Sequence, residues 1–379
     1  MILKETLRSI VKSQMSDLSR LDQGIKRSKL DEIKPEESFA VVITGIRRCG
    51  KSTLLRQLMR KVKGFCYFNF EDPRATDFEA SDFQKLSDVL REEYGGFDYY
   101  FFDEVQNAQK WELFVRTLLD KNKHVIITGS NASLLSRELG TRLTGRHITY
   151  ELFPFSFEEF LKMGNKKPGK SSFQEYLTKG GFPEYLKAGK TEILHELLND
   201  ILARDIAVRH NIRNTKILRG MALYLITNVG KEFSYNSLKK MFSLGSTNTA
   251  IDFVSYFEDS YLLFTVAKFD YSLKKQLVNN KKVYIIDNGF ISILSKKLTG
   301  DKGWLLENLV FTSLNKDNDI FYYSNRNECD FLLINRKAVI SAIQVCYDLN
   351  IGNRERELSG LKEAMDKFNL KNGLLLTNN

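Results

Sequence analysis

The residues with the clearest chemistry lie between positions 45 and 53, in the order Gly-Ile-Arg-Arg-Cys-Gly-Lys-Ser-Thr. Their spacing matches the phosphate-binding pattern G-x-x-x-x-G-K-[ST], with a β-rich run before it and a helical pattern after it. The two glycines let backbone N–H groups turn towards phosphates, and the positive end of the following helix adds to this attraction. We therefore expect nucleotide to be bound by Gly45, Arg48, Cys49, Gly50, Lys51, Ser52 and Thr53.

The expected substrate is ATP with Mg²⁺. Lys51 is predicted to reach the β- and γ-phosphates, and the Ser52 hydroxyl to take one coordination position on the metal. A second motif supports this, because the apolar run 99–102 ends in Asp103 and Glu104. Acids at the carboxyl end of a buried parallel strand suit these roles: we expect Asp103 to hold Mg²⁺ through water and Glu104 to polarise the attacking water.

Further candidates follow the next apolar run, 124–128. Ser130 and Asn131 are either sensors of the γ-phosphate or parts of a turn and helix cap. Arg142 or Arg146 is a candidate arginine finger, donated to the γ-phosphate of a neighbouring subunit in a homo-oligomer. The alternative for these arginines is a solvated or DNA-facing position.

The second half begins with a helical pattern over about 172–219, which predicts a lid on the ATPase core. Its arginines, at 204, 209 and 213, either sense the γ-phosphate or form an exposed basic face. Residues 217–290 fit a winged helix, with a second helix beginning at Ser246, Thr247 and Asn248. The wing is predicted to contact phosphates through Lys274, Lys275, Lys281 and Lys282, although winged helices also serve as protein-contact modules.

The last part has acids at two positions that a PD-(D/E)xK endonuclease requires: Glu307 on a helix and Asp330 at the start of a strand. The third element, an E-x-K triplet, is replaced by Gln344-Val-Cys346. This loss removes a metal-binding carboxylate and the lysine that would steady the nucleophile. We therefore expect a binding or structural domain of nuclease shape rather than an active nuclease.

Composition limits the remaining possibilities. The chain has 379 residues, which suggests two or three domains, and its net charge of +10 with a pI near 9.2 favours a polyanionic partner. Its four cysteines form no C-x-x-C pair, as expected of reduced thiols. With no secretory signal and no apolar run of about 18 residues, we expect a cytoplasmic protein without a membrane partner.

Taken together, these motifs resemble a known family, the AAA-type ATPases of bacteria and archaea whose carboxyl-terminal half was catalogued as a domain of unknown function. The similar stretches are 45–52, 102–106, 128–132, 143–146, 153–160 and 180–184. The resemblance implies an AAA-like ATPase module, a small helical lid, a winged-helix region and a carboxyl-terminal domain similar to a divergent restriction endonuclease.

The predicted fold class is thus α/β: a P-loop NTPase parallel sheet with a helical lid, followed by a winged helix and a small endonuclease-like α/β domain. The expected segments are a helical amino terminus, the ATPase core, the lid, the winged helix and the last domain, at 1–34, 35–155, 156–216, 217–290 and 291–379. The expected function is an ATPase that couples ATP turnover to DNA or RNA binding or remodelling. The alternatives are a nucleotide-gated switch that regulates protein partners and an ATP-dependent nuclease.

Overall fold

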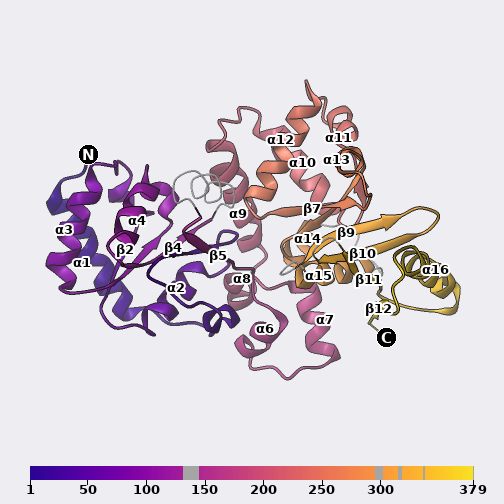
Figure 1. Cartoon of the computed structure of the whole chain (residues 1–379), viewed down its shortest axis with the longest axis horizontal. Coiled ribbons are helices and arrows are strands. Elements are labelled where there is room, and N and C mark those ends of the chain that lie inside the picture. The colour runs from indigo at the N-terminus through magenta and orange to yellow at the C-terminus, as the bar shows by residue number, and fades with distance from the viewer. Residues whose placement is uncertain (131–144, 295–301, 315–317, 336–337, 379) are drawn as a thin grey trace. The chain divides into compact units, whose positions relative to one another are not determined.

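The structure, a computed structural model, describes residues 1–130, 145–294, 302–314, 318–335 and 338–378. Two units can be distinguished, Met1–Lys167 and Pro168–Asn379 (Figure 1). The finer division into five segments stays a prediction.

Five parallel strands form the centre of the first unit, in the order β2-β3-β4-β1-β5. Because all of them run the same way, their carboxyl ends meet at one edge of the sheet. Four of them coincide with apolar runs of the sequence, at 39–44, 65–70, 99–102 and 124–128, whereas β5 is half-buried and less apolar and was not predicted. The strands are β1 (Ala40–Thr44), β2 (Phe65–Asn69), β3 (Tyr99–Asp103), β4 (His124–Gly129) and β5 (His147–Glu151).

Helices cover both faces of this sheet, which explains why its central strands are apolar without alternation. On one face, Val42 and Phe102 pack into a core with α1 (Lys4–Arg20), α3 (Asp82–Tyr94) and α4 (Trp111–Leu119). On the other, α2 (Lys51–Met59) packs against β3 and β4. Short helical turns lie at Ser28–Asp31, Pro73–Ala75 and Val105–Asn107, and α6 (Phe157–Met163) closes the unit.

The second unit contains a mixed seven-stranded sheet in the order β12-β11-β10-β9-β7-β8-β6. The parallel pairing of β7 with β9 joins the strands expected of a winged helix to those expected of an endonuclease-like domain. The two predicted regions therefore share one sheet. Its strands are β6 (Glu232–Phe233), β7 (Leu263–Lys268), β8 (Lys281–Ile285), β9 (Asp319–Ser324), β10 (Glu328–Asn335), β11 (Ala338–Cys346) and β12 (Leu374–Thr377).

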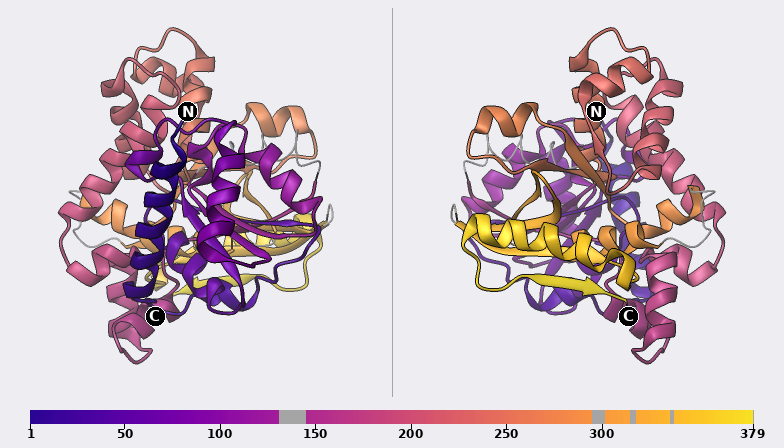
Figure 2. Two further views of the ribbon diagram at one scale, coloured as in Figure 1. Left: turned by 90° about the vertical axis from the view of Figure 1, so that its left-hand side faces the viewer. Right: turned by 90° about the vertical axis from the view of Figure 1, so that its right-hand side faces the viewer.

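The long helix α16 (Ile351–Phe368) lies along β10, β11 and β12 (Figure 2). Gly360 permits this close approach, since a Cβ there would come within 1.9 Å of the Glu328 carbonyl oxygen. The other helices are α7 (Lys170–Lys179), α8 (Pro183–Ala188), α9 (Glu192–Asp200), α10 (Thr215–Thr227), α11 (Tyr235–Met241), α12 (Thr247–Asp259), α13 (Leu273–Val278), α14 (Asn288–Leu294) and α15 (Gly303–Leu314), with a π-helix at Ile201–Val208. None of the helices in the described ranges is long and apolar enough to cross a membrane.

Candidate functional site

The glycine loop leaves the carboxyl end of β1 and closes around the side chain of Lys51. The Lys51 ammonium donates to the carbonyl oxygens of Gly45 at 3.0 Å and Ile46 at 3.2 Å, and the residue is only 4% exposed. Gly45 and Gly50 have φ values of 148° and 101°, in the region that favours glycine. Gly45 and Gly50 thus have the backbone conformations for which the sequence analysis required glycine.

Two acids face this lysine from the carboxyl end of β3. The Glu104 Oε1 atom lies 3.6 Å from Lys51 Nζ, and the Asp103 carboxylate is hydrogen-bonded to the Ser52 hydroxyl. Thr128 on β4 links the acids, because its hydroxyl donates to Asp103 and accepts from the Glu104 N–H at 2.9 Å. Parallel strand order thus brings residues from three separate motifs to one point.

The pKa values of the Asp103 and Glu104 carboxyl groups are shifted in opposite directions. Burial and the neighbouring Glu104 charge raise the pKa of Asp103, although Thr128, Ser52 and Lys51 oppose this. Burial also acts to raise the pKa of Glu104, but Lys51 and Gln106 outweigh it and hold that pKa below its usual value. Glu104 is therefore ionised at neutral pH, as a residue that orients and polarises water must be.

Gln106 and Ser130 complete the surroundings of Glu104. The Gln106 amide donates to Glu104 Oε2 at 2.5 Å and to the Ser130 hydroxyl at 3.3 Å. Glu104 itself has a φ of 50°, a left-handed conformation that is uncommon outside glycine and is often found at functional sites. Gln106 was noted only as part of a motif, and its role became visible through its contact with Glu104.

A buried arginine, Arg27, contacts the glycine loop through the Cys49 carbonyl. The sequence analysis did not identify it. The Arg27 guanidinium donates to the Cys49 carbonyl at 2.6 Å, the Phe153 carbonyl at 2.7 Å and Glu159 at 3.0 Å. It also stacks on the Phe155 ring, and Arg27 and Glu159 are each 2% exposed. No periodicity or motif surrounds Arg27 in the sequence, so only the tertiary structure shows this contact.

The Cys49 contact has a direct consequence for phosphate binding. In a trans peptide the carbonyl and the next N–H point in opposite directions. By holding the Cys49 carbonyl, Arg27 turns the Gly50 N–H the other way. The Cys49 thiol is fully buried, so this residue can offer a phosphate only its backbone.

Other predicted residues lie further from Lys51. Arg48 is exposed in the loop with a φ of 62°, and Thr53 accepts a hydrogen bond from Arg56 at 3.1 Å. Arg146 pairs with Asp120 at 2.5 Å beside the amino end of β1, at the edge of the sheet opposite the loop. Asn131 and Arg142 lie outside the described residues.

The lid arginines belong to the second unit. Arg204 is exposed and lies 3.5 Å from Asp200 on its own helix, and Arg213 is exposed. Arg209 is half-buried.

The oxygen donors of this site suit Mg²⁺. Ser52 and Asp103 offer a hydroxyl and a carboxylate that interact with each other, and Mg²⁺ commonly binds one or two protein oxygens together with phosphates and water. Within the ranges that the structure describes, no three His, Cys, Asp or Glu side chains are grouped so as to hold a metal ion. A metal here would therefore depend on the phosphates of the nucleotide.

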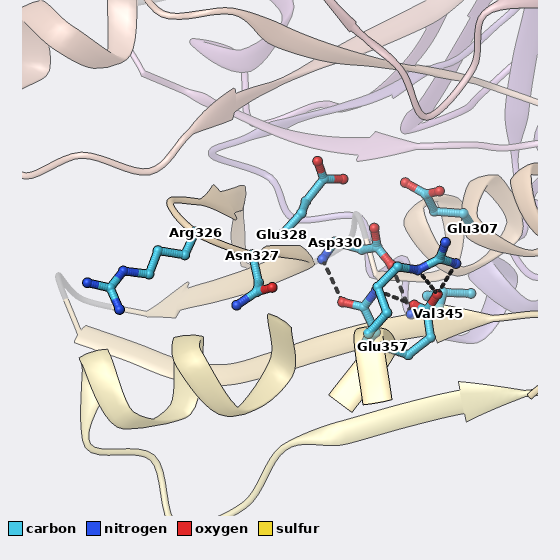
Figure 3. Close-up of a pocket in the computed structure, with 9 residues that line it drawn as sticks. Glu307, Arg326, Asn327, Glu328, Asp330, Val345 and Glu357 are labelled. Carbon is cyan, nitrogen blue, oxygen red and sulfur yellow. Dashed lines mark hydrogen bonds and ion pairs between the residues drawn. The ribbon is translucent and has the colours of Figure 1, made fainter. Parts of the chain in front are cut away.

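A second polar site lies in the second unit, in a pocket of about 510 Å³ (Figure 3). Glu307 on α15 and Asp330 on β10 line it, as the sequence predicted, together with Glu328, Gln344 and Glu357. Lys282 on β8, which was predicted to contact phosphates from a wing, contacts Glu307, Glu328 and Asp330. That prediction is wrong for Lys282, because the residue is 2% exposed and directed into the acidic cluster.

The opposite side of the pocket holds a neutral amide where the nuclease pattern has a carboxylate. The Gln344 amide donates to Glu357 Oε2 at 2.8 Å, and Arg356 donates to Glu357 Oε1 at 2.6 Å. Cys346, at the position of the missing lysine, is buried and accepts from Asn353 at 3.6 Å. Sequence analysis missed Glu357 because it lies on α16, distant from the triplet.

Comparisons with known proteins agree with the domain class of the first unit. Residues 37–161 match a family described as an AAA domain, and residues 170–301 match a domain of unknown function (DUF8612). A parallel sheet with a glycine loop, a buried lysine and paired acids defines the class: an AAA-type P-loop ATPase domain, joined to a domain of unknown function. The prediction of an AAA-type ATPase is confirmed at this level, while the winged-helix and endonuclease-like parts stay predictions.

Two relatives extend over most of the chain. The uncharacterized protein MJ1544 of Methanocaldococcus jannaschii is 34% identical over 368 residues, covering 90% of this chain and 82% of that protein. An uncharacterized protein of Haemophilus influenzae is 32% identical over 308 residues, covering 74% and 75%. The chain belongs to the same family as the Methanocaldococcus protein.

Solved structures offer weaker similarity. AMPPCP-bound DnaA from Aquifex aeolicus is 17% identical and covers 68% of this chain and 89% of its own, with a TM-score of 0.30. PCH-2 of C. elegans is 21% identical, with 45% and 46% covered and a TM-score of 0.23.

Proposed function

We propose that this protein hydrolyses ATP with Mg²⁺ at the site formed by the glycine loop and the end of β3. The observation that carries the proposal is the meeting of Lys51, Ser52, Asp103 and Glu104 at one edge of the sheet, with 3.6 Å between Lys51 Nζ and Glu104 Oε1. In a nucleotide-bound protein, Lys51 exchanges its contacts with loop carbonyls for contacts with the phosphates.

Each residue then has a separate role. Ser52 and Asp103 hold Mg²⁺, which neutralises charge on the phosphates. Glu104 orients and polarises the attacking water, while Gln106 and Ser130 fix the direction of its carboxylate. Loop N–H groups, including that of Gly50, bind the phosphate oxygens.

Two substitutions separate binding from hydrolysis. Lys51→Ala should abolish or strongly weaken ATP binding measured by calorimetry, because the only buried cation facing the phosphates in the described part of the site is lost. Glu104→Gln should bind ATP normally but hydrolyse it at least about 100-fold more slowly, the range typical of general-base removal. Normal turnover by Glu104→Gln would refute its assigned role.

We further propose that ATP turnover is coupled to DNA or RNA through the second unit. Supporting observations are the net charge of +10 and a helix pair, α11 and α12, followed by the strands β7 and β8. The Ser246 hydroxyl caps α12 by accepting from the Thr249 N–H at 3.1 Å, and Ser246 and Asn248 are exposed at the start of that helix. Lys274 and Lys275 are exposed on α13, between β7 and β8.

Nucleic-acid coupling is tested by measuring ATP hydrolysis with and without single- and double-stranded DNA and RNA. Binding should weaken steeply with salt as counterions are released, and Lys274→Gln with Lys275→Gln should reduce that salt dependence. A nucleotide-gated switch for protein partners is the alternative. It would show ATP hydrolysis that is indifferent to every polynucleotide, with no salt-dependent binding.

Arg146 can act as an arginine finger only from a neighbouring subunit, because within its own unit it lies at the opposite edge of the sheet from Lys51. If it does, Arg146→Ala should lower ATP turnover without weakening ATP binding. Mixing this variant with inactive Glu104→Gln protein should restore part of the activity.

A further inference from the structure

Three acids that line the pocket of the second unit contact a buried lysine, where an endonuclease of the predicted type would hold a metal ion. Lys282 Nζ lies 2.5 Å from Glu328 Oε1, 3.1 Å from Asp330 Oδ1 and 3.3 Å from Glu307 Oε1. Figure 3 shows these three carboxylates on one side of the pocket, with Asp330 between the other two. One ammonium group therefore contacts three carboxylates that come from two different elements.

Several elements of the fold hold Lys282 and Glu307 in position. Lys282 is held on β8 by pairing with β7 on one side and β6 on the other. Asn308 on α15 binds both backbone groups of Ile285 on β8, at 2.7 and 2.9 Å, and this sets Glu307 opposite Lys282. Gly230, with a φ of 75°, leaves room for the Glu307 carboxylate, since a Cβ there would come within 2.9 Å of its Oε2 atom.

Glu307 and Asp330 also accept hydrogen bonds from other groups. Tyr284 donates to Glu307 at 2.7 Å, and the Val345 N–H donates to Asp330 at 2.9 Å. Gln344 contributes a neutral amide, whose oxygen accepts from the Asp330 N–H at 3.3 Å. These contacts supply Glu307 and Asp330 with hydrogen-bond donors without a metal.

We infer that Lys282 replaces a divalent cation as the counter-charge of Glu307, Glu328 and Asp330, so that this pocket binds no Mg²⁺ and cleaves no phosphodiester. A divalent ion that used the same oxygens would lie within a few ångströms of a buried ammonium group, in a region where charge repulsion is weakly screened. The metal residues implied by the endonuclease resemblance therefore do not fit a metal in this chain. This inference concerns the second unit and does not depend on ATP hydrolysis by the first.

The inference predicts that removal of the ammonium creates a metal site. Lys282→Met leaves three carboxylates without their cation, and a hard divalent ion is a suitable replacement. Nucleotide-free full-length protein is titrated with Mn²⁺, and free Mn²⁺ is followed by its electron paramagnetic resonance signal. Lys282→Met should bind one more equivalent than the wild type, and saturating Mn²⁺ should raise its unfolding temperature by about 5 °C.

Matched variants identify the source of that binding. Lys282→Arg keeps the charge and should bind Mn²⁺ like the wild type, while adding Asp330→Asn to Lys282→Met should remove the extra equivalent. A folded Lys282→Met protein without additional Mn²⁺ binding overturns the inference.

If Lys282→Met does not fold, a comparison of the wild type with Asp330→Asn still tests the inference. Wild-type protein and Asp330→Asn should bind the same amount of Mn²⁺ and should both leave single- and double-stranded DNA and RNA intact. A loss of Mn²⁺ binding in Asp330→Asn would overturn the inference, and so would Mn²⁺-dependent cleavage that this substitution abolishes.

Discussion

Replacement of Arg27 by methionine tests whether the phosphate loop depends on support from outside its own motif. Methionine keeps most of the apolar stem but removes the guanidinium, which donates to Glu159 and to the carbonyls of Cys49 and Phe153. Removing one partner of a buried ion pair costs about 3–5 kcal/mol, because the other charge is left unpaired. The Ser28 and Ser156 N–H groups still donate to Glu159, so we expect the lower part of that range.

Nucleotide binding should weaken as well. Without Arg27, the Cys49–Gly50 peptide is free to rotate, and the Gly50 N–H no longer has a fixed direction. We expect the dissociation constant for ATP to rise about tenfold, equivalent to about 1.4 kcal/mol. Arg27→Lys should recover part of this loss, since one ammonium group can still reach a carbonyl.

The measurement must report the first unit alone. The chain has two tryptophans, and Trp111 is buried in the first unit, so a Trp304→Phe background assigns the fluorescence change to that unit. Glu159→Gln and the double variant Arg27→Met with Glu159→Gln complete a double-mutant cycle. We expect a coupling energy of at least about 1 kcal/mol between the two residues.

The control is Arg8→Met, which removes a guanidinium from the partly exposed contacts with Glu5 and Glu92 in the same unit. Its effect should be much smaller, because solvent screens these pairs. Equal effects of Arg27→Met and Arg8→Met on stability, with ATP affinity unchanged, would refute the reasoning.

Three further outcomes are expected. Gly50→Ala should abolish ATP binding in a filter assay, because its Cβ would come within 2.8 Å of the Arg27 guanidinium, whereas Gly95→Ala, also at positive φ but with open space, should bind normally. Gln106→Leu should lower the turnover number with little change in ATP affinity, because the Glu104 carboxylate loses a donor at 2.5 Å. Burial raises the pKa of Asp287 to about 7, so ionisation opposes folding and stability falls as pH rises from about 4 to 7. Denaturant titration should find Asp287→Asn more stable than the wild type at pH 8 by up to a few kcal/mol, about 1.4 kcal/mol for each unit of pKa shift, and no more stable at pH 4.

The meeting of the glycine loop with the acids of β3 was predictable because each motif is local in the sequence. Gly45 to Thr53 form one continuous loop and helix start, and Asp103 and Glu104 end a strand whose apolar run is clear. Once the strands are parallel, their carboxyl ends must meet, so the pairing of these motifs follows from the sequence pattern. The apolar runs also determined four of the five strands in the first sheet.

The sequence pattern could not predict the contacts made by Arg27, Glu159 and Gln106. Arg27 and Glu159 are separated by 132 positions, and nothing in their local sequences distinguishes a buried ion pair from two solvated charges. A charged residue is assigned to the surface by default, and only the packing of chain segments around it shows that it is buried.

In the second unit, the sequence likewise could not predict the contacts of Lys282. The sequence determined that Glu307 and Asp330 lie on elements of suitable type, and that Gln344 and Cys346 depart from the nuclease triplet. The tertiary structure determined the rest, because Lys282 on β8 contacts acids from α15 and β10, although β7 and β9 lie between β8 and β10 in the sheet. Local sequence specifies which groups are present, whereas contacts between residues far apart in the chain determine which charges are buried together.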